Sequence, residues 1–172
     1  MIDKNQFSVC TSVYKNDNPE YVGTALDSML VNQTVKPTEI VLVQDGPVPS
    51  GLSVLLSEYE EKYPDVMHIF RFEKNGGLGN ALKIGVENAK YDIIARMDSD
   101  DICLPDRFEK QLAYLEMHPE CDIVGGQMTE FIDRPDNIVG RRAVPLTNDE
   151  IYDFMKSRCA LNHVTVMFRK AA

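Results

Sequence analysis

The stretch Glu39-Ile40-Val41-Leu42-Val43-Gln44 decides the fold of this chain, because it places four apolar residues in a row between two polar ones. A short apolar run of this kind predicts a strand that is buried on both faces, as the strands of parallel sheets are. Similar runs recur before and after it, and stretches with a helical spacing of apolar residues lie between them. Alternating strands and helices predict an α/β fold, with a Rossmann-like, mostly parallel sheet flanked by helices in three layers.

The alternation is regular over the first 104 residues and changes afterwards. The first part predicts strands at residues 7–13, 39–44, 67–72 and 91–97, with helices at 19–30, 52–59 and 78–89 between them. The second part predicts a helix opened by Pro105, a strand over 122–132 bent at Gly125-Gly126, a polar loop over 134–142, a helix capped by Thr147 and Glu150, and a last strand over 164–168. Because only four residues follow that strand, we expect it to be short of partners, which favours a chain truncated at its C-terminus and leaves a homo-oligomer open.

Length and composition indicate a single folded domain over residues 1–172. The 27 acidic residues outnumber the 18 basic ones, and a surface with a net charge of −9 repels the phosphate backbone of nucleic acids. No apolar run approaches the roughly 20 residues that a membrane-spanning helix needs, and residues 1–6 lack the apolar core of an export signal. We therefore expect a cytoplasmic protein without a transmembrane segment that does not bind nucleic acid.

Polar residues follow each of the first four predicted strands. Ligands of open parallel sheets bind beyond the carboxyl ends of the strands, so these exits are the place to look for a site. The exits are Ser12-Val13-Tyr14, Asp45-Gly46, Asn75-Gly76-Gly77 and Asp98-Ser99-Asp100-Asp101. Together they predict a ligand site at one edge of the sheet.

The acidic exit carries the strongest chemical signal. Three carboxylates within four residues repel one another, and a hard divalent cation such as Mg²⁺ or Mn²⁺ removes that cost while bridging to substrate phosphates. Asp98, Asp100 and Asp101 are therefore candidate metal ligands, although a solvated acidic turn is an equally good interpretation of these four residues alone. A calcium loop fits poorly, because Cys103 occupies the position that requires glycine.

The other exits are ambiguous when taken one at a time. Gly77 and Gly79 lie at the start of a predicted helix, where a phosphate contact and a simple flexible turn are both open. Asp45 is typical of a turn aspartate bonded to its own backbone, and Tyr14 could stack on a flat ring. Arg96 is a charge in a buried run, so it must be paired, either with the nearby aspartates or with a bound diphosphate.

Taken in order, these segments resemble the family 2 glycosyltransferases, which have the GT-A fold and an aspartate-x-aspartate metal motif. The resemblance rests on residues 8–14, 45–46, 75–76, 96–101, 104–107 and 162–170, and it spans nearly the whole chain. It implies that Ser12, Val13 and Tyr14 line the nucleobase and ribose pocket. It also implies that Asp45 accepts a hydrogen bond from the base imide, favouring uracil, and that Asn75 and Gly76 flank the nucleotide.

The same resemblance assigns roles to the acidic exit and its surroundings. Arg96 would order the acidic loop, and Asp98 would face the ribose or the sugar. Asp100 would bind Mn²⁺ or Mg²⁺ on the diphosphate with Asp101 supporting it, and Asp106-Arg107 would brace the loop from the next helix.

The activity implied by the resemblance is an inverting, metal-dependent sugar transfer from a nucleotide-sugar donor, favoured to be a UDP-sugar. The acceptor would be a saccharide or a lipid-linked saccharide in surface polysaccharide synthesis, with a peripheral location at the inner face of the membrane left open. The Glu-Asp pair that supplies the catalytic base in this family would lie beyond Ala172; Glu130 and Asp133 are acidic but do not match that motif. Two alternatives stay open: a nucleotidyltransferase, although residues 12–17 are not the basic glycine-rich loop it would need, and a nucleotide-sugar-binding fragment without turnover.

Overall fold

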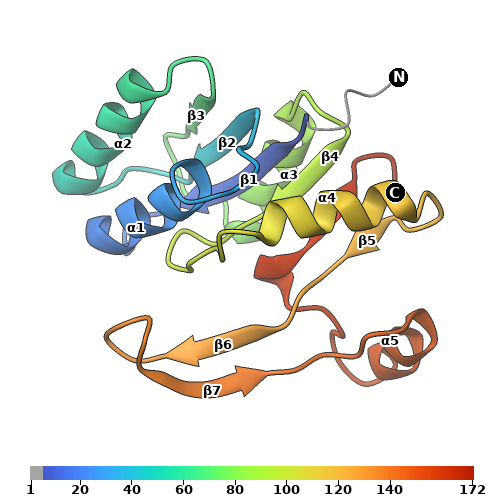
Figure 1. Ribbon diagram of the computed structural model, residues 1–172. Coiled ribbons are helices and arrows are strands. Elements are labelled where there is room, and N and C mark those ends of the chain that lie inside the picture. Colours follow the sequence, from blue (N-terminus) through green and yellow to red (C-terminus); the bar gives the residue numbers. More distant parts are fainter. Residues whose placement is uncertain (1–5) are drawn as a thin grey trace.

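The computed structural model describes residues 6–172 and shows a six-stranded sheet with the order β3-β2-β1-β4-β8-β5 (Figure 1). Its strands are β1 (Ser8–Val13), β2 (Glu39–Gln44), β3 (Met67–Arg71), β4 (Ile93–Arg96), β5 (Ile123–Val124) and β8 (Met167–Arg169). The pairs β1–β2, β2–β3 and β1–β4 are parallel, whereas β8 runs antiparallel to both β4 and β5. The predicted mostly parallel sheet is therefore confirmed.

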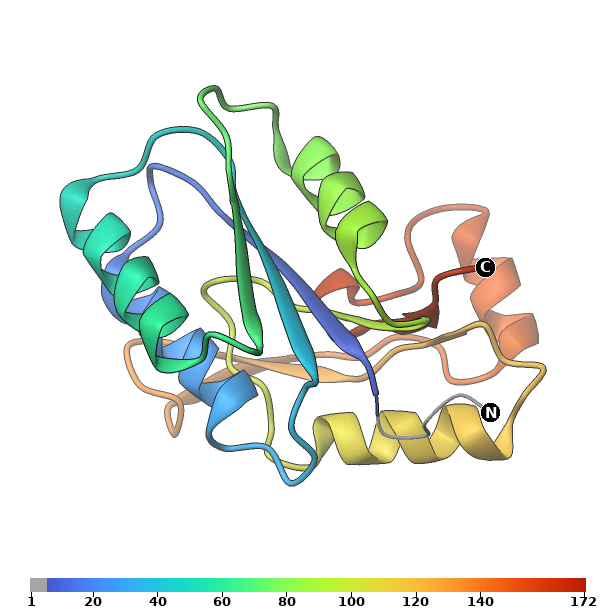
Figure 2. The ribbon, with the colours of Figure 1, turned by 90° about the horizontal axis from the view of Figure 1, so that it is seen from above.

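Helices cover both faces of this sheet, which makes three layers (Figure 2). The helices are α1 (Pro19–Leu30), α2 (Ser50–Lys62), α3 (Leu78–Asn88) and α4 (Arg107–Met117). Alternate residues of the strands enter two separate clusters: one packs Val9 and Ile40 against α1, α2 and α4, and the other packs Cys10 and Val41 against the α3 side. Burial on both faces explains why β2 is apolar along its centre.

Local sequence signals set the start of two helices. The side chain of Asn18 accepts a hydrogen bond from the Glu20 amide at the start of α1, with Pro19 in the first turn. Thr147 and Glu150 form the predicted capping box at the start of α5 (Asn148–Met155). The helix expected to open at Pro105 begins instead at Arg107, two residues later.

The region 122–142 differs from the sequence expectation. The long strand is broken at Gly125-Gly126 into β5, which joins the main sheet, and β6 (Met128–Phe131), which leaves it. The expected polar loop over 134–142 is wrong at its end, because β7 (Ile138–Arg142) pairs antiparallel with β6 as a second, two-stranded sheet. The polar and glycine residues around Ile138-Val139 do not indicate a strand by themselves. The strand forms because it pairs with β6 across the turn.

The last strand also differs from the expectation. A short 3₁₀ turn, η1 (His163–Thr165), comes first, and β8 lies inside the sheet with β4 on one side and β5 on the other. The expectation that this strand is short of partners is therefore wrong, and with it the reason given for a homo-oligomer. Among the residues described, no helix is long and apolar enough to cross a membrane. Residues 1–5, which carry most of the sequence judged for an export signal, lie outside the described residues.

Candidate functional site

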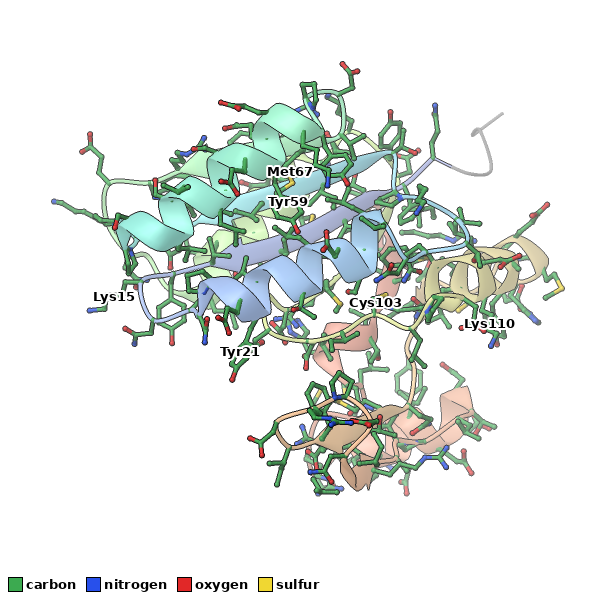
Figure 3. All side chains as sticks on the ribbon, turned by 60° about the vertical axis from the view of Figure 1, so that its left-hand side comes forward. Lys15, Tyr21, Tyr59, Met67, Cys103 and Lys110 are labelled. Atoms are coloured by element: carbon green, nitrogen blue, oxygen red, sulfur yellow. The ribbon has the colours of Figure 1, made fainter. Side chains whose placement is uncertain are left out.

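The carboxyl ends of β1, β2 and β4 and the beginning of α3 meet at one edge of the sheet (Figure 2). Parallel pairing in register places Val13 beside Gln44, so the loops that follow β1 and β2 start at the same level. Figure 3 shows Lys15 in the loop after β1, at this end of the sheet. The expected convergence of the strand exits is thus present in the structure.

Asp45 organises the loop that precedes α3. Its carboxylate accepts hydrogen bonds from the amide N–H groups of Gly76 (2.7 Å) and Gly77 (2.9 Å) and from Nδ2 of Asn75 (2.9 Å). The side chain is only 6% exposed, so these three donors replace the water that the charge would otherwise need. The interpretation of Asp45 as a turn residue bonded to its own backbone is wrong, because its partners lie 30 to 32 positions further along the chain.

The contacts of Asp45 also show which anion the backbone amides of the glycine-rich loop bind. The N–H groups of Gly76 and Gly77 point at Asp45, so the anion that they bind is the protein's own carboxylate. Gly46 allows the close approach: its φ is +91°, and a Cβ there would lie 2.8 Å from the amide nitrogen of Asn75. Asp45, Asn75 and Gly76 therefore form one hydrogen-bonded unit.

Arg96 and Asp98 form the centre of the acidic exit. Arg96, on the last position of β4, is 4% exposed and makes an ion pair with Asp98 through Nη2. The predicted pairing of this buried charge with a nearby aspartate is confirmed. Within the described part of the chain, its Nε and Nη1 have no hydrogen-bond partner, which leaves two buried donors without a protein acceptor.

The aspartates of the acidic exit repel one another. Burial raises the pKa of Asp101, and the neighbouring charges of Asp98 and Asp100 raise it further. Nevertheless, no three His, Cys, Asp or Glu side chains among residues 6–172 lie close enough together to hold one metal ion. The donor chemistry fits a cation held by one or two carboxylates together with substrate phosphates, and it does not fit an all-protein metal site built from all three aspartates.

Arg107 braces this edge from α4. Its Nη2 donates to the carbonyl oxygens of Arg96 (2.9 Å) and Val166 (3.3 Å), and so joins the ends of β4 and η1. This expectation is confirmed for Arg107. It is wrong for Asp106, which is half-buried and forms its ion pair with Lys110 one helical turn away.

Two further residues at this edge were not predicted as site residues from the sequence. The first is Asp17, whose carboxylate accepts hydrogen bonds from the amide of Tyr14 and the hydroxyl of Ser99, both at 3.0 Å. The second is His163, which lines a recess of about 440 Å³ together with Arg96 and apolar side chains of α3 and β8. Burial lowers the pKa of His163, and the charge of Arg96 lowers it further. The place of Asp17 at a strand exit was a signal for the former, whereas His163 required the fold.

The remaining predicted residues are placed as follows. Val13 is buried, Ser12 is half-buried and Tyr14 is 41% exposed, so its ring is free to contact a ligand. Asp100 is exposed at the tip of the acidic loop. Glu130 pairs with Arg142 within the β6–β7 hairpin, and Asp133 lies in the turn of that hairpin with a φ of +62°.

Comparison with other proteins gives the family. The family model described as Glycosyl transferase family 2 matches residues 8–172. An uncharacterized glycosyltransferase of Haemophilus influenzae is 45% identical over 167 residues, which are 97% of this chain and 61% of that protein. The amylovoran biosynthesis glycosyltransferase AmsE of Erwinia amylovora is 43% identical, covering 95% of this chain and 60% of its own.

A third relative is the UDP-Gal:alpha-D-GlcNAc-diphosphoundecaprenol beta-1,3-galactosyltransferase of Escherichia coli. It is 34% identical to this chain and aligns with 98% of it, but with only 60% of its own length. The chain thus spans about three fifths of the length of these curated relatives.

Solved structures show the same fold. S. aureus TarS (residues 1–349) in complex with UDP-GlcNAc has a TM-score of 0.65 at 18% identity, over 96% of this chain and 46% of its own. The mannosyltransferase PcManGT from Pyrobaculum calidifontis, in complex with GDP-Man and Mn²⁺, also has a TM-score of 0.65 at 18% identity, over 95% and 44%. The fold is therefore the GT-A fold expected from the order of the motifs. Because the family model spans all but the first seven residues and close relatives align over nearly the whole chain, this protein belongs to glycosyl transferase family 2.

Proposed function

We propose that this chain holds the donor site of an inverting, metal-dependent glycosyltransferase that uses a UDP-sugar. The observation that carries the proposal is the shared edge where Asp45 fixes the loop 75–77 and Arg96 fixes Asp98. Two charged side chains that are more than nine-tenths buried are arranged there around exposed loops, which is typical of a preorganised ligand site.

The proposed preference for uridine rests on the carboxylate of Asp45 and on the exposed ring of Tyr14. Its carboxylate uses three donors of the protein, and a carboxylate has about four acceptor positions, so one stays available for the imide N–H of uracil. The exposed ring of Tyr14 can stack on the base. The donor named in the E. coli relative is a UDP-sugar, and TarS was solved with UDP-GlcNAc, which agrees with this assignment.

A divalent cation would be held by Asp100 and Asp98 together with the diphosphate oxygens. When bound, it would supply positive charge that stabilises the departing diphosphate. The chain's own residues do the rest of the positioning: Arg96 holds the Asp98 carboxylate in one orientation, and Arg107 holds the carbonyl of Arg96. PcManGT was solved in complex with GDP-Man and Mn²⁺, which supports a cation in this site.

The acceptor side follows from the relatives. AmsE is named for amylovoran biosynthesis, and the E. coli relative is named for a saccharide linked to diphosphoundecaprenol. We infer a saccharide or lipid-linked saccharide acceptor in surface polysaccharide synthesis, which would place the enzyme on the cytoplasmic side of the membrane. We expect the catalytic base in a segment that corresponds to the part of these relatives outside the aligned region.

Titration calorimetry with UDP tests the proposal directly. We expect UDP to bind more tightly with Mn²⁺ or Mg²⁺ than with a chelator, and to bind more tightly than GDP. Asp100→Ala should remove most of the metal dependence, whereas the control Asp65→Ala, at an exposed position after α2, should leave it unchanged. Equal UDP affinity with metal and with chelator would overturn the metal part, and equal affinity for UDP and GDP would overturn the uridine part.

A further inference from the structure

Asp17 connects two loops of the donor site that are far apart in the sequence. Its amide N–H donates to the carbonyl of Tyr14 (3.1 Å), and its Oδ2 accepts the amide N–H of Tyr14 (3.0 Å), which closes the turn after β1. The same Oδ2 accepts the hydroxyl of Ser99 at 3.0 Å, from the acidic loop 82 positions later. One oxygen atom therefore joins the exit of β1 to the exit of β4.

The surroundings of Asp17 disfavour a charged carboxylate. Asp17 is half-buried, and burial raises its pKa most, with the charges of Asp100 and Asp98 adding to the rise. The hydrogen bonds from Tyr14 and Ser99 act in the opposite direction and stabilise the charged form. Asp17 therefore adds a fourth acidic group beside the other three, where hydrogen bonds from both loops stabilise its charge.

We propose that Asp17 is a positioning residue that couples the Tyr14 turn to the acidic loop through Ser99. The nature of the ligand rests on the proposed function, but the coupling itself is a property of the free protein. With the tether in place, the backbone at Tyr14 is linked to the acidic loop that carries Asp100, so a ligand that touches both loops orders less of the protein on binding. A ligand that touches only one loop gains little from the tether.

The experiment is a double-mutant cycle with Asp17→Ala, Ser99→Ala and the double variant, and Asp17→Asn as the matched control. Asparagine keeps an oxygen that can accept both hydrogen bonds, so it removes the charge and retains the tether. Thermal melting and circular dichroism establish that each variant is folded.

The first readout needs no ligand. In hydrogen exchange of the free protein, Ser99→Ala should speed exchange at the amides of residues 14–17, and Asp17→Ala should speed it at residues 98–101. Asp17→Asn should leave both segments protected. Unchanged exchange at residues 14–17 in Ser99→Ala would overturn the inference, because the two loops would then move independently.

The second readout is UDP affinity with Mg²⁺ and with chelator. Ser99→Ala should weaken the metal-dependent affinity about fivefold, the usual effect of losing one hydrogen bond of ~1 kcal/mol. Asp17→Ala, which also loses the hydrogen bond from the Tyr14 amide, should weaken it at least as much, and the double variant should bind no more weakly than Asp17→Ala. Additive losses would contradict a shared tether. Wild-type protein that fails to bind UDP while the exchange coupling is present would refute the donor assignment and leave the coupling established.

Discussion

At the scale of single residues, the site depends on charges that the protein itself has already paired. Asp45 accepts hydrogen bonds from an amide side chain and two backbone N–H groups, and Arg96 is paired with Asp98. Both charges are buried, so their orientation is fixed before any ligand arrives, which is what electrostatic preorganisation requires.

Asp45→Asn tests how far the loop depends on this charge. An amide in place of one carboxylate oxygen would turn an N–H donor toward the donors of the loop. The free energy of unfolding should therefore fall by about 1–3 kcal/mol, and the variant should unfold at a lower urea concentration. The UDP affinity should fall as well, because the loop 75–77 loses its anchor. Asp65→Asn, at an exposed site, is the control in the same urea titration. Full stability together with unchanged UDP binding would show that the hydrogen bonds of Asp45 are dispensable.

His163 gives a prediction about pH. Its pKa in the folded protein is lowered by burial and by Arg96, so on acidification the unfolded chain takes up the proton first. Wild-type protein should therefore lose stability as the pH falls from about 6.5 through the folded pKa, and His163→Gln should lose less. As the pH is lowered from 7.5 to 5, the melting temperature of His163→Gln should therefore increase relative to that of the wild-type protein. His118→Gln, at the exposed end of α4, is the control, and an equal pH profile for both variants would contradict the assignment.

At the scale of elements, the sequence predicted the helices and strands that are marked by a local pattern of residues. It missed the features that depend on pairing with a distant part of the chain. β2 and α1 follow from their own residues, through an apolar run and a cap. β7 and the interior position of β8 follow from partners elsewhere in the chain: β6 across a turn, and β5 on the outer side of β8. No local pattern in residues 138–142 or 164–169 carries that information.

The loop between β2 and α2 offers an element-scale prediction. Gly46→Ala should destabilise the protein by about 1–3 kcal/mol, because alanine is strained at a φ of +91° and its Cβ would clash with the backbone of Asn75. Gly79→Ala is the matched control: it lies in the first turn of α3 with nothing within 4 Å of its Cβ, so it should be neutral or slightly stabilising. Chemical denaturation of the two variants makes the comparison, and equal stability would mean that the 45–46 turn relaxes without cost.

At the scale of the whole molecule, the candidate site and the second sheet occupy different parts of the structure. The donor-site residues gather at the exits of β1, β2 and β4, whereas the β6–β7 hairpin and α5 lie below the main sheet (Figure 1). The sequence located the exits because parallel strands share an edge, and this rule needs no knowledge of side-chain contacts. It could not supply the contacts of Asp45 with residues 75–77 or of Asp17 with Ser99, which only the packing of the sheet brings within reach.

The most direct test of the donor site is to map the amide resonances that shift when UDP and Mg²⁺ are added to the protein. We predict that the shifts concentrate at residues 12–17, 45–46, 75–79 and 96–101, and that Asp100→Ala removes those in the last segment when Mg²⁺ is present. A second recess, of about 450 Å³, lies against α5 and includes Val144, Leu146 and Phe154, which makes it a competing location for a ligand. Shifts confined to residues 144–154, with the strand exits unchanged, would contradict the account.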